Sequence, residues 1–551
     1  MLTSHYLKVI LLVTSISQSI CLNALFISDG AAGHVTPIFE LAKAMKSHNV
    51  TFLTQQAAKS YLDLNLPSSP QFRIIFANDS IDAFSYEKNL EQNLIQTLAN
   101  QSLLEVLHKV ILFQSNFIKP LLNKTIHILM HDRFDVIVAS SMAFGIPVLC
   151  EKIQTPCVVQ SSAALPNLFD FTLPNAFSLL TSKQLLRPTY RIYNALFNVR
   201  LAIKLVPKMI PTLYTIFQSL PQIPGPFYDS YTIKNLLSSN SKSLNLLSIP
   251  ATFYTSPYSH QYVRYLGAFV DETSIVDDND DALTAWIKSK PTSSIIYGAF
   301  GSSSLIPYDR MYNLVSGIAM FLFQTDNSFL LLALRNANYE TYQAVLKQLR
   351  SNKMGQTLEN KQRVWIEKGF VKQKWILQQS SVKVFVSHCG MGSLMEALYF
   401  SKSILGMPFS GEQFSNAIAI ENLNVGQSLL IPPSIIQNLL KPYDLVNYSF
   451  TIESVTNKVL NLWTNVVYER AAQQLSLEMK HAGGVKRAVE EIEFFVNLNG
   501  DLDRFIPFET TLWYYQRYKL DLLLIFVTFP GLFIMYIVSN LRKEQRKTKT
   551  D

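Results

Sequence analysis

The sequence is poor in cysteine and in charged residues. Only four of its 551 residues are cysteine, and Cys21 ends an N-terminal apolar stretch. The other three, Cys150, Cys157 and Cys389, are too few for a disulfide framework, even in an oxidising compartment. Charged residues make up 16% and hydrophobic residues 48%, a composition that excludes a disordered chain and is typical of a globular protein with membrane segments.

The excess of positive charge is too dilute to indicate a nucleic-acid-binding protein. The formal net charge is +8, of which residues 1–21 contribute +1 and residues 539–551 contribute +3. A net charge of +4 remains for the long middle of the chain, whereas nucleic-acid-binding surfaces concentrate positive charge in one patch. No cluster of histidine and cysteine indicates a metal site, so the sequence predicts neither a nucleic-acid partner nor a metal.

Both ends of the chain carry targeting signals. Residues 1–21 are typical of a secretory signal, with Lys8 before a short apolar core at 9–16, which is too short for a membrane anchor. Residues 522–538 lack charge and as a helix would reach about 26 Å, enough to span the membrane of the endoplasmic reticulum. Aromatic residues precede this run and a basic tail follows it, which favours a membrane span over a buried core helix.

These signals predict a single-pass type I protein of the endoplasmic reticulum membrane, with luminal domains and a cytoplasmic tail at 539–551. Lys547 and Lys549 in that tail resemble a dilysine retrieval signal. Five N-x-S/T sequons permit glycosylation without arguing for it: Asn49, Asn78, Asn100, Asn123 and Asn447.

The chain between these ends has the pattern of an α/β protein with two Rossmann-like domains. A strand at 23–28, a glycine-containing turn, a helix at 37–46 and a strand at 49–54 form the first unit. The acidic stretch 271–281 marks a boundary, after which a strand at 293–302 opens a second series. We therefore predict domains at 22–270 and 271–450, followed by helices and a membrane approach at 451–521.

The region 165–250 is leucine- and proline-rich, with helical patches such as 193–204. It would suit an apolar acceptor pocket or a membrane-facing surface, and ordinary packed helices fit it equally well.

A turn between a strand and a helix in the second domain has the pattern of an anion site. The turn at 388–393, His-Cys-Gly-Met-Gly-Ser, follows a buried strand at 382–387 and precedes a helix. Unpaired N–H groups at such a helix N-terminus attract a phosphate. Glu396 lies in the first turns of this helix, where its carboxylate can face a hydroxylated sugar beside the phosphates.

The stretch 365–416 around this turn resembles the nucleotide-sugar signature of the UDP-glucuronosyl/UDP-glucosyl transferase family. The family pattern is approximately W-x-P-Q, then H-x-G-x-N-S-x-x-E, then P-x-x-x-D/E-Q-x-x-N. The opening segment GHVTPIFELAKAM also resembles the start of these enzymes. The resemblance implies a GT-B arrangement, in which two Rossmann-like domains face each other, and a C-terminal membrane helix.

By this resemblance a UDP-sugar would bind the second domain. Phe370 stands where the family has tryptophan, Lys372 where it has proline and Gly392 where it has asparagine. The residues implied for UDP-sugar binding are Ser302, Phe370, Gln373, His388, Gly390, Gly392, Ser393, Glu396, Glu412 and Gln413.

The resemblance further implies that His34 is the general base on the acceptor hydroxyl, a task that suits a neutral imidazole. In the family, a second strand ends with an aspartate that orients this histidine, and here that position is Ser140. The Ser140 hydroxyl can fix the tautomer of His34 but cannot stabilise the imidazolium by charge, so either Ser140 or another residue supports His34. Asp135 lies at the wrong end of the strand, and Asp29 is expected to be near only in sequence.

The predicted function is inverting, metal-independent transfer of a hexose from a UDP-sugar to a hydroxyl of a small lipophilic acceptor, with no cofactor besides the donor. Ser140 prompts one alternative, a non-catalytic UDP-sugar-binding membrane protein. A lipid-linked sugar transferase shares the fold and is the other alternative.

Overall fold

The computed structural model describes most of the chain in two separate units. The described residues are 21–60, 62, 71–77, 119–143, 145–162, 174, 178, 180, 183–218, 242–254, 261–272, 275, 281–301, 304–369, 371–409, 412–430, 450–508, 512–517 and 519–547. One unit contains the described residues up to 258 and Val263–Gly500, and the other contains 259–262 and Asp501–Asp551. Ser302, Phe370 and all of the predicted signal 1–21 except Cys21 lie outside the described residues.

The first sheet of the larger unit is entirely parallel. Its strand order is β3-β2-β1-β4-β5-β6-β7, so the order reverses between β1 and β4. In open α/β sheets, ligands bind at the carboxyl ends of the strands beside such a reversal. The strands are β1 Asn23–Ile27, β2 Asn49–Gln55, β3 Phe72–Ala77, β4 Val136–Ser140, β5 Cys157–Ser161, β6 Leu244–Leu247 and β7 Val263–Tyr265.

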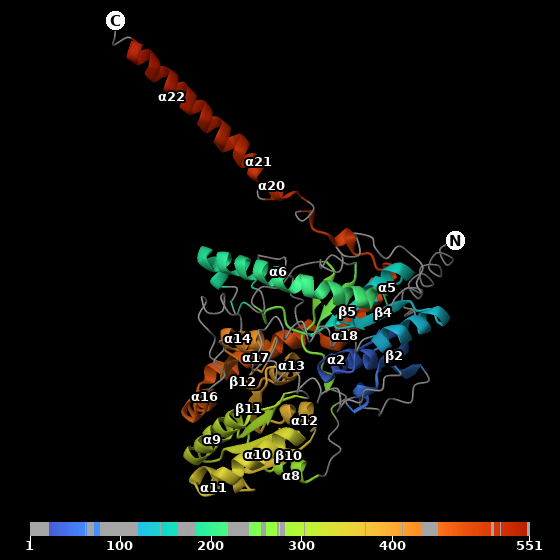
Figure 1. Cartoon of the computed structure of the whole chain (residues 1–551), viewed down its shortest axis with the longest axis vertical. Helices are drawn as coiled ribbons and strands as arrows, with labels where there is room; N and C mark the ends of the chain where they lie inside the picture. The colour runs from blue at the N-terminus through green and yellow to red at the C-terminus, as the bar shows by residue number, and fades with distance from the viewer. Residues whose placement is uncertain are drawn as a thin grey trace, which may run out of the picture. The chain divides into compact units, whose positions relative to one another are not determined.

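The second sheet is also parallel, with the order β10-β9-β8-β11-β12-β13 and a reversal between β8 and β11. Its strands are β8 Ile295–Ala299, β9 Phe329–Leu334, β10 Val364–Lys368, β11 Val382–Ser387, β12 Ser403–Gly406 and β13 Gly426–Ser428. Helices lie on both faces of this sheet, so β8 and β9 bury side chains pointing to either side. The predicted α/β class with two Rossmann-like parts is confirmed (Figure 1).

Helices connect the strands and follow the second sheet. In order they are α2 Ala32–Ala44, α5 Ile146–Ile153, α6 Pro188–Gln218, α8 Ala282–Lys288, α9 Tyr308–Gln324, α10 Asn336–Leu349, α11 Lys353–Glu359, α12 Gln373–Gln378, α13 Met391–Tyr399, α14 Gln413–Asn422, α16 Ile452–Thr464, α17 Val466–Ala482 and α18 Gly484–Asn497.

The first helix begins earlier than the sequence predicts. A start at Pro37 was expected because proline suits a first turn, but α2 begins at Ala32 and contains Pro37 in its interior. Ala31 is the N-cap, and its carbonyl accepts hydrogen bonds from the N–H groups of His34 and Val35. The early start places His34 in the first turn of α2, directly after the carboxyl end of β1.

The smaller unit contains the predicted membrane helix. Its helices are η6 Asp503–Phe505, α20 Tyr514–Arg517, α21 Leu520–Leu523 and α22 Phe529–Lys547, with a π-helical turn at Leu524–Thr528. The run Leu520–Lys543 is long and apolar enough to cross a membrane by length and composition, and none of its apolar window is buried. It includes the predicted segment 522–538, whose membrane insertion stays a prediction.

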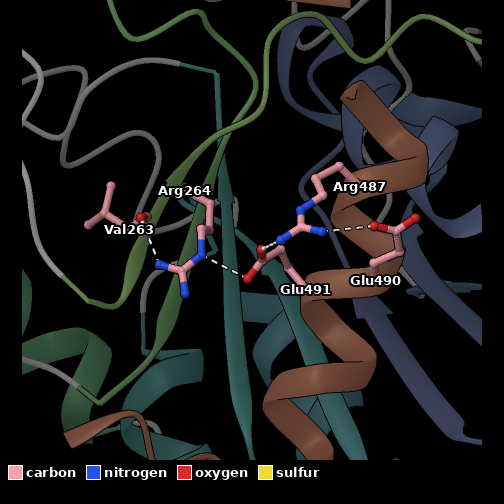
Figure 2. Close-up of polar contacts among 5 residues, drawn as sticks. All are labelled: Val263, Arg264, Arg487, Glu490 and Glu491. Carbon is pink, nitrogen blue, oxygen red and sulfur yellow. Dashed lines mark hydrogen bonds and ion pairs between the residues drawn. The ribbon is translucent and has the colours of Figure 1, made fainter. Parts of the chain in front are cut away.

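The last helix of the larger unit, α18, is attached to the first sheet by buried charge. Glu491 on α18 accepts hydrogen bonds from Arg264 on β7, at 2.7 Å, and from Arg487 one turn earlier (Figure 2). On the same helix, Glu493 lies 2.8 Å from His48 Nε2. Because the Glu491 carboxylate is almost fully buried, it depends on both guanidinium groups for compensation.

We predict that Glu491→Ala lowers the free energy of unfolding by about 2 kcal/mol, because Arg264 loses a charged acceptor in a partly buried setting. Glu490→Ala is the matched control, since Glu490 pairs with Arg487 in the exposed surface and its loss costs under about 1 kcal/mol. Denaturant unfolding of both variants measures the difference, and equal destabilisation would contradict the role given to Glu491.

Candidate functional site

His34 has a carboxylate partner, and it is Asp29. The Nδ1 atom of His34 lies 2.7 Å from Asp29 Oδ2. Asp29 follows β1 by two residues, and its side chain is fully buried. Our expectation that Asp29 is near only in sequence was therefore wrong. The chain turns back between β1 and α2, which brings residues five positions apart into contact.

The surroundings of Asp29 fix its orientation. Thr54 Oγ1 and Ser28 Oγ donate to its carbonyl oxygen, and Gln55 accepts from the N–H of Gly30 beside it. Its second carboxylate oxygen, Oδ1, is buried and has no hydrogen-bond partner among the described residues. A buried carboxylate with so few donors needs a cation, and a protonated His34 supplies one.

Ser140 does not support His34. It ends β4 and is buried as predicted, but its Oγ accepts a hydrogen bond from the N–H of Met142. The carboxylate beside His34 comes from the loop after β1, so of the two options left open by the sequence, Ser140 or another residue, the structure places another residue, Asp29, in contact with His34.

The charges around His34 raise its pKa. Burial by itself would lower that pKa, but Asp29 raises it through charge and hydrogen bonding, and the charge of Glu412 raises it further. The net pKa lies above the ordinary 6.5. Glu412 is the N-cap residue of α14, so His34 and a predicted sugar-binding residue of the second sheet lie near each other.

The turn after β11 encloses His388. Its ring lies against two glycines: a Cβ on Gly390 would come within 2.3 Å of its Nε2 atom, and one on Gly301 within 2.6 Å. Burial lowers the pKa of His388 to about 4, so the ring is neutral at physiological pH. Its Nδ1 is buried and has no hydrogen-bond partner among the described residues. His388 can therefore offer a hydrogen bond to a ligand, but no charge.

Two further side chains hold this turn. Cys389 has a φ of 65°, a left-handed conformation that costs free energy for a residue other than glycine. The amide of Asn416 on α14 donates to the Cys389 carbonyl, at 2.9 Å, and its oxygen accepts from Tyr254, at 2.8 Å. These bonds compensate the strain and place Gly390 as the N-cap of α13, without a side-chain cap of its own. The N–H groups of the first turn are thus available to an anion.

Three of the residues predicted to bind the UDP-sugar contact one another beside the N-terminus of α13. The amide of Gln373 donates to Ser393 Oγ at 3.2 Å and to Glu396 Oε2 at 2.7 Å. Burial raises the pKa of Glu396, although Lys374 and the bond from Gln373 oppose that rise. The arrangement presents a carboxylate, a hydroxyl and an amide from two helices, α12 and α13, which is a set suited to ribose or sugar hydroxyls.

Lys374 links helix α12, which packs on the second sheet, to helix α2, which follows the first strand of the first sheet. Its Nζ donates to Glu40 Oε1 on α2 at 2.8 Å, and Lys43 lies 3.1 Å from the other oxygen of Glu40. Burial would lower the pKa of Lys374, but Glu396 and Glu40 raise it, so this lysine stays charged. The ion pair connects α2, which carries His34 in its first turn, to α12, which carries Gln373.

The remaining predicted residues fall into three groups. Gln413 opens α14 and is buried, with its side-chain oxygen accepting from the N–H of Phe409. Gly392 lies in the first turn of α13, and a Cβ there would meet nothing within 4 Å. The roles of Ser302 and Phe370 stay predictions, because both lie outside the described residues. No cluster of three His, Cys, Asp or Glu side chains able to hold a metal occurs in the described part of the chain.

Sequence reasoning considered and rejected Asp29, and it missed Lys374, Asn416 and Tyr254. Asn416 ends the P-x-x-x-D/E-Q-x-x-N pattern and so carried a signal. Asp29 lies just past the carboxyl end of β1, which is itself a signal for ligand-binding residues. Lys374 and Tyr254 gave no signal, because their partners are distant in the sequence.

Comparison with known proteins gives matches of one kind. Residues 331–438 match the family described as UDP-glucoronosyl and UDP-glucosyl transferase. The chain is 26% identical over 230 residues to a flavanone 7-O-glucoside 2''-O-beta-L-rhamnosyltransferase of Citrus maxima, covering 41% of this chain and 46% of that protein. It is 31% identical over 141 residues to a UDP-glycosyltransferase of Talaromyces amestolkiae, covering 24% and 26%. The chain thus spans less than half the length of these curated relatives.

A solved structure resembles the chain over a larger share. The complex of Os79 from O. sativa with U2F and trichothecene has a TM-score of 0.56 and 15% identity, covering 86% of this chain and 100% of that one. This likeness shows the fold, which is the predicted GT-B arrangement.

The two glycines of the turn are expected to respond oppositely to a methyl group. Gly390→Ala forces the His388 ring to move and should lower the melting temperature, by an overpacking cost of about 1–3 kcal/mol. Gly392→Ala meets open space in a helix and should leave stability unchanged or raise it by up to about 1 kcal/mol. Thermal unfolding of both variants measures this, and a harmless Gly390→Ala would refute the described packing of His388.

Proposed function

We propose that the chain is a glycosyltransferase of the UDP-glucuronosyl and UDP-glucosyl transferase family, to whose pattern residues 331–438 match. It transfers a hexose from a UDP-sugar to a hydroxyl of a small lipophilic acceptor, with inversion at the anomeric carbon. The observation that carries this proposal is the contact between His34 and Asp29 at the carboxyl end of β1, near Glu412 of the donor half.

His34 acts as the general base. Its Nδ1–H donates to Asp29, which leaves Nε2 as the atom that takes the proton of the acceptor hydroxyl. As the proton arrives, the imidazolium is stabilised by the buried carboxylate of Asp29. The acceptor oxygen then attacks the anomeric carbon from the face opposite the diphosphate, so the C–O bond to UDP breaks as the new one forms and the configuration inverts.

The donor half stabilises the leaving diphosphate with its backbone. The N–H groups at the start of α13 and the dipole of that helix receive the phosphate oxygens, and His388 and Ser393 donate hydrogen bonds. Glu396 accepts from the ribose hydroxyls, and Gln373 fixes its orientation. Glu412, whose charge contributes to the raised pKa of His34, would accept from the transferred sugar. These groups supply the stabilisation without requiring a metal.

The finer features of the proposal come from the sequence. A neutral hexose is favoured because no arginine of the stretch 365–416 is placed to receive a sugar carboxylate. The N-terminal signal, the apolar helix within Leu520–Lys543 and the basic tail support a type I orientation in the endoplasmic reticulum membrane, with the transferase in the lumen.

The alternative of a non-catalytic UDP-sugar-binding protein loses its main motive. It rested on the missing carboxylate at Ser140, and Asp29 supplies that carboxylate. UDP release from a panel of UDP-sugars, measured on the full-length protein with hydroxylated acceptors, tests the proposal. We expect release with a small lipophilic acceptor and at least about a hundredfold loss in His34→Ala. Binding without release would favour the non-catalytic alternative, and release only with a dolichol or sterol would favour lipid-linked transfer.

The pH dependence separates Asp29 from Ser140. His34 must be neutral to accept a proton, so the rate rises with pH through its raised pKa. Asp29→Asn removes a cause of the raised pKa of His34, so the part of the pH–rate profile in which the rate rises with pH, its acidic limb, should move to lower pH. The maximal rate should fall by about 10²–10⁴-fold. Ser140→Ala is the matched control and should leave the limb in place, because its Oγ contacts Met142 and not His34. A shift in Ser140→Ala, or none in Asp29→Asn, would contradict the assignment.

A further inference from the structure

The helix α6 exposes an apolar stripe on the side that faces away from the core. Figure 1 shows α6 as a long helix along one side of the larger unit. Four large apolar side chains with helical spacing are between 46% and 69% exposed: Ile192, Leu196, Val199 and Ile203. At about 100° per residue they lie within about 60° of one another around the helix axis. They therefore form one continuous stripe, which we name the α6 stripe.

The α6 stripe is not the core-facing side of the helix. The core-facing residues are Tyr193, Asn194, Phe197, Asn198 and Leu201, all at most 5% exposed. They lie on the opposite side of the helix from the stripe, where two asparagines interrupt the apolar contacts. A surface helix of a soluble protein normally has polar residues opposite its buried face, so a large apolar stripe there indicates a contact partner.

The charges beside the stripe are all of one sign. The segment 183–218 contains no aspartate or glutamate and has cations at Lys183, Arg187, Arg191, Arg200, Lys204 and Lys208. Arg191 lies on one flank of the stripe and Arg200 and Lys204 lie on the other. An apolar face bordered by cations on a long helix is the pattern of helices that lie in the headgroup region of a bilayer.

We infer that α6 lies in the surface of an anionic membrane, with the α6 stripe inserted among the lipids and its cations at the headgroups. The charge argues for lipid against a second copy of this chain. A two-fold interface through the stripe would place the cations of one copy against those of the other, which costs free energy. The inference does not depend on the proposed transferase activity, because it rests on α6 alone.

The experiment places a fluorescent label on the stripe of the full-length protein. Ile203→Cys and Leu477→Cys serve as labelling sites, because their side chains are 69% and 68% exposed and both belong to the larger unit. Leu477 on α17 is the matched control. Cys150, Cys157 and Cys389 are buried, and Cys21 is replaced by serine in both variants. The protein is reconstituted into vesicles of phosphatidylcholine, with or without phosphatidylglycerol, that carry a nitroxide on the acyl chains.

We expect the nitroxide to quench the label at position 203, since an inserted face lies about 5–10 Å into the headgroup boundary. The label at 477 should stay unquenched, which separates insertion from mere tethering. Phosphatidylglycerol should increase the inserted fraction. The double variant Arg191→Gln/Lys204→Gln should decrease the ratio of protein with α6 inserted to protein with α6 not inserted about 25-fold, at roughly fivefold for each cation.

Equal quenching at both positions, or none at 203, would overturn the inference. So would protection of the label at 203 from aqueous iodide in lipid-free detergent that is independent of the detergent concentration, because another protein surface would then cover the stripe. Protection that grew with protein concentration would assign the stripe to a second copy of the chain.

Discussion

Parallel strand pairing determines where the chemistry of this protein lies. Every described strand pair in both sheets is parallel, so the carboxyl ends of the strands in each sheet meet at one edge. The loop after β1 carries Asp29, the first turn of α2 that follows it carries His34, and the turn after β11 carries His388. Each lies beside the position where its sheet reverses strand order. The positions of the base and of the anion-binding turn that we propose follow from the same rule, applied once in each sheet.

The ion pair of Lys374 with Glu40 links a helix of the first Rossmann-like part, α2, to a helix of the second, α12. Glu40 lies on the buried side of α2, two turns after His34, and Lys374 follows Gln373, which orients Glu396. Buried charges need partners, so these two side chains hold α2 and α12 at one separation. The proton acceptor and the carboxylate proposed for the ribose are therefore positioned by one contact, in addition to the backbone of each sheet.

The sequence predicted the α/β class and the glycine turn, because both depend on local patterns. The buried strand predicted at 382–387 is β11, and the turn followed from glycine spacing. The partner of His34 could not be predicted in this way. The position of Ser140 at the end of its strand indicated it as a partner of His34, whereas the path of the loop between Ile27 and Ala32 brings Asp29 into contact with His34 instead. Loop paths depend on contacts such as that of Gly30 with Gln55, which no local pattern reports.

The enclosure of His388 by Gly301 and Gly390 has a consequence for how such a site can vary. These three residues come from two loops almost ninety positions apart, yet a methyl group on either glycine would occupy the space of the imidazole. Replacing the histidine with a smaller residue would free that space for both loops at once. A smaller side chain at position 388 should therefore reduce the cost of a methyl group at position 301 or 390, so substitutions at these positions are expected to be non-additive.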